Sequence, residues 1–260
     1  MGYRTIIVMP DNQSHEKMDT IRALGAELVT VPPTKYADCN HFQHVSRRMA
    51  EEIDGAIWAG QFDNTANRKA HIETTARELW DQLEGRIDGF TCAAGTGGTF
   101  AGISSFLKER REAVRCVLAD CPGSGLKAYV ETGEFRGSGE GTLQEGIGIS
   151  RLTQNFAKAK ADAAVFVSDA EALAMAFHLL RHEGLFVGPS AALNVVAAVK
   201  VARDLPEGAA VVTVLCDSGE RYARKIYTKR WRAREEAAAA RRGADDALAF
   251  LAPPAGAAKD

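Results

Sequence analysis

Short apolar runs alternate with longer amphipathic segments along the chain. The apolar runs have the length of buried strands and are residues 5–9, 27–31, 89–94, 115–120, 164–167, 185–187 and 210–215. The amphipathic segments have helical spacing and are residues 14–24, 41–53, 67–83, 99–110, 169–182 and 190–205, with a further helix from residue 220. Strands and helices that alternate in this way predict an α/β fold with a mainly parallel sheet.

Two stretches do not follow this alternation. Residues 121–150 are rich in glycine and have no periodicity, so we expect a long loop, and loops of that length are often functional or disordered. From Arg230 the composition changes to an Ala/Glu/Arg run at 235–242 and then to Pro253-Pro254 and small residues. We expect a solvated helix there, followed by a frayed end.

The N-terminus begins almost directly on a strand. Residues 1–4 carry no targeting signal and lead at once into the apolar residues 5–9. Because a domain rarely begins on an interior strand, we expect either an edge strand here or a chain whose first elements lie upstream. In the second case this strand lacks a neighbour and exposes an edge that is prone to association.

Composition and charge are those of an ordinary globular protein. Hydrophobic residues make up 46% and charged residues 25% of the 260 residues. The formal net charge of −2 gives no reason to expect a nucleic-acid partner, and no apolar run approaches the ~18 residues of a membrane span. The five scattered cysteines indicate reduced thiols in an intracellular protein, and the six histidines form no metal-binding motif.

A glycine-rich turn follows the strand at 89–94 and opens the helix at 99–110. Its sequence is Gly95-Thr96-Gly97-Gly98-Thr99. Glycines let the backbone approach a ligand closely, a helix N-terminus offers unpaired N–H groups, and the threonine hydroxyls add donors. This chemistry suits a phosphate group, although glycines can also serve only to make a bend. No Lys-Ser or Lys-Thr pair follows, as a Walker A loop needs, and Phe100 replaces the third glycine of the dinucleotide fingerprint.

Two further strand ends carry polar, glycine-containing turns. Ser190 stands at the start of a helix, where its hydroxyl can bond a ligand ring or cap the helix. Asp217 and Ser218 end the last strand and can likewise be helix caps. Ligands of α/β proteins bind beyond the carboxyl ends of the strands. We therefore expect these residues and the 95–99 turn to surround one site for a phosphate-bearing small molecule.

The order of these motifs resembles that of cysteine synthases and cystathionine β-synthases over about residues 2–230. The residues that carry the resemblance are Gly2-Tyr3-Arg4, Met9-Pro10, Ser14, Glu16-Lys17, residues 24–28, residues 61–67, His71, Thr74-Thr75, Glu78, Trp80, residues 95–99, residues 145–148, residues 183–185 and residues 217–222. The resemblance implies a fold-type II pyridoxal-phosphate enzyme, like the tryptophan synthase β-subunit, with its cofactor between two α/β domains. It implies a remnant of the small domain at 1–60, the large cofactor-binding domain at 61–230 and a tail at 231–260.

The resemblance also implies roles for single residues. The 95–99 turn is similar to the loop that grips the phosphate of pyridoxal 5′-phosphate, and Ser190 to the residue whose neutral hydroxyl bonds the pyridine nitrogen. Gln61 matches a glutamine that helps to bind the substrate carboxylate, and Gly146 and Gly148 match a loop that moves on substrate binding. The implied substrates are an amino acid and sulfide or a thiol. The implied complete protein is a homodimer in the cytoplasm or an organelle.

Two motifs of the family are not found in this sequence. One surrounds the Schiff-base lysine, and the other is a Ser/Thr-Gly-Asn-Thr-Gly loop that binds the substrate carboxylate; both precede the matched region in the family. The chain has eleven lysines, none in a matching context. We therefore expect a truncated N-terminus and no catalytic lysine. Ala191-Ala192 also replaces the Ser-Gly that follows the pyridine contact in the family, which affects fine positioning.

The leading hypothesis is an enzyme that replaces the leaving group of an O-activated serine, such as O-acetylserine, with sulfide to make cysteine. Cystathionine synthesis or another β-replacement is the alternative within the family. A hypothesis of another class is a non-catalytic fragment or pseudoenzyme, because turnover needs the lysine. A nucleotide-dependent oxidoreductase rests on the fold alone, and the missing third glycine weighs against it.

Overall fold

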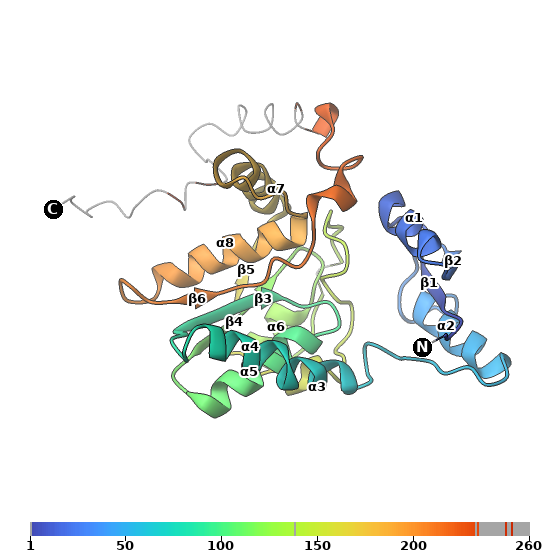
Figure 1. Cartoon of the computed structure of the whole chain (residues 1–260), viewed down its shortest axis with the longest axis horizontal. Helices are drawn as coiled ribbons and strands as arrows, with labels where there is room; N and C mark the ends of the chain where they lie inside the picture. Colours follow the sequence, from blue (N-terminus) through green and yellow to red (C-terminus); the bar gives the residue numbers. More distant parts are fainter. Residues whose placement is uncertain (1, 138, 232, 234–247, 249–250, 252–260) are drawn as a thin grey trace.

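Two parallel sheets of different size organise the chain (Figure 1). The computed structural model describes residues 2–137, 139–231, 233, 248 and 251. Four strands form one sheet in the order β5-β4-β3-β6, and β1 and β2 form the other, with every pairing parallel. The strands are β1 Ile6–Pro10, β2 Glu27–Val31, β3 Gly89–Ala93, β4 Arg115–Asp120, β5 Ala163–Phe166 and β6 Val211–Val212. The predicted α/β fold with parallel sheets is confirmed.

Helices cover both faces of the four-stranded sheet. On one face, α7 (Asp169–His178) and α8 (Pro189–Arg203) form a core of small and branched side chains. On the other face, the rings of Phe90, Phe100 and Phe156 stack in sequence between the sheet and α5. The helices of this second face are α3 Ala66–Glu73, α4 Thr75–Gln82, α5 Gly98–Arg110 and α6 Leu126–Thr132, with the short η1 Phe156–Lys158.

A smaller unit lies to one side of this body (Figure 1). It consists of β1, α1 (His15–Ala23), β2 and α2 (Phe42–Glu52), and we call it the small lobe; the part from α3 to η3 (Gly219–Tyr222) is the large lobe. Among the described residues β1 pairs with β2, and its side chains are half-buried. The predicted domain boundary at residue 60 falls between α2 and α3 and stays a prediction. Most of the predicted tail at 231–260 lies outside the described residues.

One predicted helix is in fact two. The spacing at 67–83 predicts a continuous helix, but the structure breaks it at Thr74, where φ is −120° and ψ is −82°. Thr74 Oγ1 donates a hydrogen bond to Ala70 O at 2.8 Å, and such bonds to the preceding turn compete with helix continuation. The prediction of a single helix is therefore wrong.

The predicted long loop at 121–150 contains a helix, α6. The buried carboxylate of Asp120 accepts a hydrogen bond from Lys127 N at 2.7 Å, and Ser124 Oγ accepts one from Leu126 N at 3.3 Å. These caps stabilise a helix too short to show periodicity. In addition, the strand predicted at 185–187 is a single bridge between Val187 and Ser218, and the helix predicted from 220 is the short η3.

Candidate functional site

The glycine-rich turn lies at the carboxyl edge of the four-stranded sheet. β3 ends at Ala93, and α5 begins at Gly98 with Gly97 as its N-cap residue, at φ 87° and ψ −7°. Among the described residues, no hydrogen-bond acceptor pairs with the backbone N–H groups of Gly97, Thr99 and Phe100. Unpaired N–H groups at the positive end of a helix dipole favour an anion at this turn.

Close packing explains why the turn needs its glycines. A Cβ on Gly95 would overlap the carbonyl oxygen of Gly146. A Cβ on Gly97 would lie 2.6 Å from Phe156 Cβ, and the positive φ of Gly97 disfavours any other residue type. A Cβ on Gly98 would overlap the side chain of Asn67. The Gly146 segment therefore lies directly against the turn.

Neighbouring side chains brace the two threonines of the turn. Thr96 Oγ1 accepts hydrogen bonds from Asn67 Nδ2 at 2.9 Å and from Gly98 N at 3.3 Å. Its own hydroxyl hydrogen has no acceptor among the described residues, so Thr96 can donate it to a ligand. Thr99 Oγ1 lies 3.1 Å from His71 Nε2, and burial lowers the pKa of His71, which keeps this imidazole neutral at neutral pH.

A cavity of about 420 Å³ lies between the small lobe and the turn. This is the size of a pocket for a small molecule. Of the predicted site residues, those that line it are Gln61, Gly95, Thr96 and Gly146. The other lining residues are 7–10, Gln13, Ile21, Tyr36, 41–43, Phe62, 147–151 and Thr153. The predicted residues that do not line it are Gly97, Gly98, Thr99 and Ser190.

Ser190 lies in the first turn of α8, with its side chain buried. Its Oγ donates a hydrogen bond to Asp217 Oδ2 at 2.9 Å, and Asp217 Oδ1 accepts another from Ala191 N at 2.9 Å. Asp217 therefore caps α8, whose N-cap residue is Gly188, and the alternative in which Ser190 is the cap is wrong. In this arrangement the Ser190 hydroxyl hydrogen is donated to Asp217, so it would have to rotate away from Asp217 to reach the nitrogen of a pyridine ring. Its contact with a pyridine nitrogen stays a prediction.

One buried amide connects the strand ends at this edge. Asn194 Oδ1 accepts a hydrogen bond from Ala93 N at 2.7 Å, and its Nδ2 donates one to Val214 O at 2.8 Å. Ala93 precedes the glycine-rich turn, and Val214 precedes Asp217. These contacts bring the start of α8, the end of β3 and the segment after β6 to one edge of the sheet.

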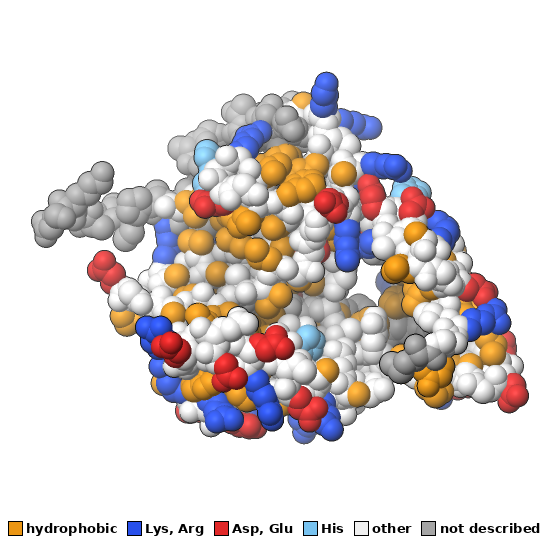
Figure 2. Space-filling model, in the orientation of Figure 1, with side chains coloured by type: hydrophobic (Ala, Val, Ile, Leu, Met, Phe, Trp, Pro, Cys, Tyr) orange, Lys and Arg blue, Asp and Glu red, His pale blue; other side chains and the backbone are white. Residues whose placement is uncertain are grey.

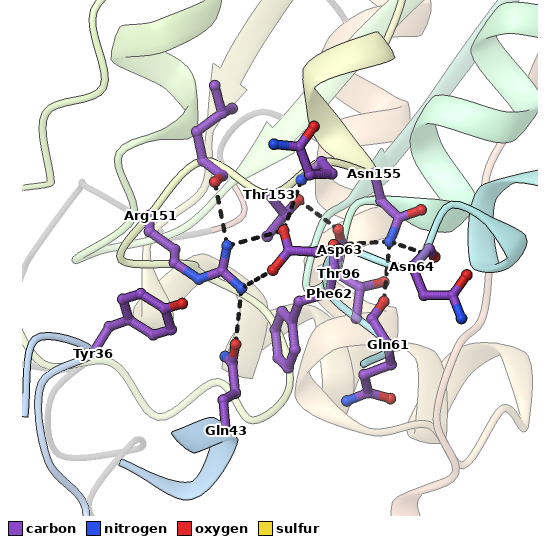
Figure 3. A network of polar contacts seen from close by, with 12 residues as sticks. Tyr36, Gln43, Gln61, Phe62, Asp63, Asn64, Thr96, Arg151, Thr153 and Asn155 are labelled. Carbon is purple, nitrogen blue, oxygen red and sulfur yellow. Dashed lines mark hydrogen bonds and ion pairs between the residues drawn. The ribbon is translucent and has the colours of Figure 1, made fainter. Parts of the chain in front are cut away.

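A polar network beside the cavity holds the segment that contains Gln61 (Figure 3). Arg151 donates hydrogen bonds to both carboxylate oxygens of Asp63, at 3.1 and 2.7 Å, and one to Gln43 Oε1 in α2 at 2.8 Å. The guanidinium carbon lies 4.3 Å from the centre of the Tyr36 ring, which is cation–π geometry. Arg151 thus joins the small lobe to the Gln61 segment.

Asn155 fixes the same segment with a fully buried amide (Figure 3). The two hydrogens of its Nδ2 are shared among the carbonyl oxygens of Gln61, Phe62 and Asn64, at 3.0, 2.8 and 3.3 Å. Its Oδ1 accepts a hydrogen bond from Arg68 N at 3.2 Å. Three carbonyl groups on one amide set the path of the backbone on both sides of Gln61, whose own side chain is exposed.

The sequence pattern predicts no role for Arg151 or Asn155, and it includes Asp63 only as part of the motif at 61–67. The available signal was the three polar residues Gln61, Asp63 and Asn64, which follow the helix predicted at 41–53. Nothing local in the sequence pairs these residues with residues 151–155. Only the tertiary structure shows that residues 151–155 contact residues 61–64.

Replacing Asp63 by Asn tests the network. Hydrogen bonding from Arg151, and then from Gln154 N, holds the pKa of Asp63 below its usual value. Such a carboxylate stabilises the fold above its unfolded-state pKa of about 3.9, and this contribution is lost as the pH falls through the lower folded-state pKa. Because Asp63 is partly exposed, we expect Asp63→Asn to lower the free energy of unfolding by only about 1–2 kcal/mol at pH 7.

Urea titrations at neutral and at strongly acidic pH measure this loss, which should shrink toward zero in acid. Asp19→Asn is the matched control. Asp19 forms an ion pair with Arg22 on the surface of α1, and the side chain of Asp19 is 65% exposed. It should change stability by less than about 0.5 kcal/mol. Equal losses in the two variants, or a loss that does not depend on pH, would contradict the role given to Asp63.

Comparison with known proteins identifies the class to which this fold and site belong. Residues 1–217 match the family described as "Pyridoxal-phosphate dependent enzyme". The chain is 34% identical to an O-acetylserine dependent cystathionine beta-synthase from Helicobacter pylori, whose crystal structure superposes with a TM-score of 0.79 over 86% of this chain and 71% of that one. The chain therefore belongs to the pyridoxal-phosphate-dependent enzymes of fold type II, as the resemblance implied.

Within that family, relatives of this chain are cysteine synthases. It is 45% identical to cysteine synthase 1 of Neurospora crassa over 237 residues, which are 88% of this chain and 62% of the relative. It is also 45% identical to the cysteine synthase of Dictyostelium discoideum over 239 residues, 88% of this chain and 63% of the relative. The chain thus spans less than two thirds of the length of these curated relatives.

The geometry of the turn fits the phosphate of this family's cofactor. The unpaired N–H groups at the start of α5 and the free hydroxyl hydrogen of Thr96 are all donors, as a phosphate requires. Among the described residues, no group of acidic, histidine or cysteine side chains is arranged to hold a metal ion. Likewise, none of the described helices is long and apolar enough to cross a membrane.

Proposed function

We propose that a protein containing this chain and the remaining length of its relatives makes cysteine by pyridoxal-phosphate-dependent β-replacement. The substrates are an O-activated serine, such as O-acetylserine, and sulfide or a thiol. The observation that carries the proposal is the glycine-rich turn at the start of α5, with its unpaired N–H groups beside the Gly146 segment. The identity to cysteine synthases supports the choice of reaction.

In this proposal the residues of the chain bind and orient. The N–H groups of the 95–99 turn and the hydroxyl of Thr96 hold the cofactor phosphate, while Ser190 approaches the pyridine nitrogen from α8. When bound, the cofactor supplies an electron sink for chemistry at the amino-acid substrate. Gln61 helps to bind the substrate carboxylate, and Gly146 belongs to the loop that closes over the substrate.

A second candidate is cystathionine formation, in which a thiol amino acid replaces sulfide. The structural relative that is an O-acetylserine dependent cystathionine beta-synthase favours it. Both reactions use the same activated serine, so the choice lies in the nucleophile. We further propose a small domain at 1–60, a large domain at 61–230, an intracellular homodimer as the complete protein, and a non-catalytic role for the chain by itself.

A fusion protein tests the reaction. The part of the Neurospora crassa cysteine synthase that precedes its matched region is joined to residue 1 of this chain, and product formation from O-acetylserine is measured with sulfide and with homocysteine. Cysteine formation with sulfide is the expected result. The control replaces each lysine of the added segment with alanine, which should abolish product. If the fusion forms product with homocysteine but not with sulfide, the reaction is cystathionine formation. A properly folded fusion that makes neither product would contradict the proposal.

A further inference from the structure

Glu145 fastens three separate segments to one another. Its side chain is 4% exposed, and both of its oxygens are engaged. Oε2 lies 2.7 Å from Lys17 Nζ and accepts a hydrogen bond from Ser14 N at 3.3 Å, while Oε1 lies 2.6 Å from Lys225 Nζ. Ser14 and Lys17 belong to the start of α1 in the small lobe, whereas Lys225 follows η3 in the large lobe. One buried carboxylate therefore holds the two lobes together.

The residues after Glu145 lie against the glycine-rich turn. The carbonyl oxygen of Gly146 occupies the space that a Cβ on Gly95 would need, and Gly148 N donates a hydrogen bond to Ala94 O at 3.3 Å. Gly146 and Gly148 have φ values of 82° and 75°, and few residue types other than glycine adopt this backbone conformation. Gly146, Ile147 and Gly148 also line the 420 Å³ cavity. Glu145 therefore directly precedes Gly146, the residue that contacts the turn and lines the cavity.

The charges of this cluster explain why the carboxylate is needed. Burial by itself raises the pKa of Glu145, but the hydrogen bonds and positive charges of Lys17 and Lys225 outweigh this and hold the pKa below its usual value. Glu145 is therefore ionised at neutral pH. Without its charge, two ammonium groups would face each other across a half-buried junction, and like charges repel strongly where water is excluded. A second contact, from Arg224 N to Glu16 Oε1 at 3.2 Å, joins the same two segments.

We propose that Glu145 is a positioning residue: its bonds to Lys17 and Lys225 hold the 146–148 segment against the glycine-rich turn and keep α1 closed over the cavity. The ligand affinity of the turn then depends on a carboxylate that does not touch the ligand. The ligand part of this inference rests on the proposed function, in which the turn binds the cofactor phosphate. A merely structural salt bridge would add stability without affecting the turn.

Hydrogen exchange of the unliganded chain tests the positioning. We expect Glu145→Gln to speed exchange of the hydrogen-bonded amides of Lys17, Met18 and Gly148 at least tenfold, with β3 and β4 unchanged. The control is Glu131→Gln, which removes a surface partner of Lys127 in α6 and should leave both regions as they are. If Glu145→Gln does not fold, Lys225→Gln replaces it, because it removes one partner only. Unchanged exchange at Gly148, or uniform acceleration throughout the chain, would overturn the proposal.

Pyridoxamine 5′-phosphate is the probe for the ligand part, because it carries the phosphate but has no aldehyde to react with lysines. We expect Glu145→Gln to weaken its binding at least tenfold and Glu131→Gln to leave it unchanged within twofold. If exchange at Gly148 becomes faster but the affinity for pyridoxamine 5′-phosphate stays the same, Glu145 only stabilises the structure, and the proposal is overturned. If the wild-type chain does not bind the probe, the proposed phosphate site fails, and hydrogen exchange alone decides whether Glu145 positions the segment.

Discussion

Assayed by itself, the 260-residue chain is expected to form no cysteine from O-acetylserine, sulfide and pyridoxal 5′-phosphate. None of the residues that line the cavity is a lysine, and the two lysines at the lobe junction, Lys17 and Lys225, are both bound to Glu145. We therefore expect the described part of the chain to offer neither a covalent anchor for the cofactor nor a base for the α-proton of the substrate. Loss of such a group costs at least about 10³-fold in rate.

Product formation and the absorbance of a lysine-bound cofactor are the two readouts, and both should be at background. The fusion protein described above is the positive control, since it supplies the family's lysine segment to the same residues. Cysteine formation by the chain at the rate of the fusion would contradict this prediction. One of its eleven lysines would then have the catalytic role, and Lys17→Ala would be the first variant to examine.

Replacing Gly97 by Ala is expected to destabilise the fold strongly, because backbone strain and a steric overlap act on the same methyl group. The left-handed φ of Gly97 costs an alanine about 1–2 kcal/mol, and the Cβ would lie 2.6 Å from Phe156 Cβ and 2.8 Å from Phe156 Cα. Overpacking of this kind adds about 1–3 kcal/mol, so we expect a total loss of about 2–5 kcal/mol. Urea denaturation followed by tryptophan fluorescence measures it.

Gly141→Ala is the matched control for Gly97→Ala. Its Cβ would have no atom within 4 Å, and its φ lies outside the left-handed region. It should change the free energy of unfolding by less than about 0.5 kcal/mol. Equal stabilities of the two variants would mean that the turn can relax away from Phe156, and that the close packing described here does not constrain it.

The order of elements could be predicted because each strand is a short apolar run between polar turns. The bounds predicted for the second and fourth strands, 27–31 and 115–120, are those observed for β2 and β4. The predictions failed where a tertiary or side-chain contact decides the backbone. Thr74 breaks a helix by bonding to Ala70 O, and the buried Asp120 caps a short helix that has no periodic signal.

The candidate site could be predicted only in part, for a related reason. The 95–99 turn is contiguous, so its glycines and its place between a strand and a helix are visible in the sequence. The contacts that support it join distant residues: Arg151 and Asp63 are 88 positions apart, and Lys17 and Glu145 are 128 apart. No local pattern pairs such residues, because only the tertiary fold brings them together.

We expect the glycine-rich turn of this chain to bind the phosphate of the family's cofactor. Equilibrium dialysis against pyridoxamine 5′-phosphate and against pyridoxamine tests it most directly, because the two compounds differ only in the phosphate. Charge-assisted hydrogen bonds from the turn predict binding of the phosphorylated compound at least about tenfold tighter, with inorganic phosphate as a competitor and with the preference lost in Gly97→Ala. Equal affinities of the chain for the two compounds would contradict the claim.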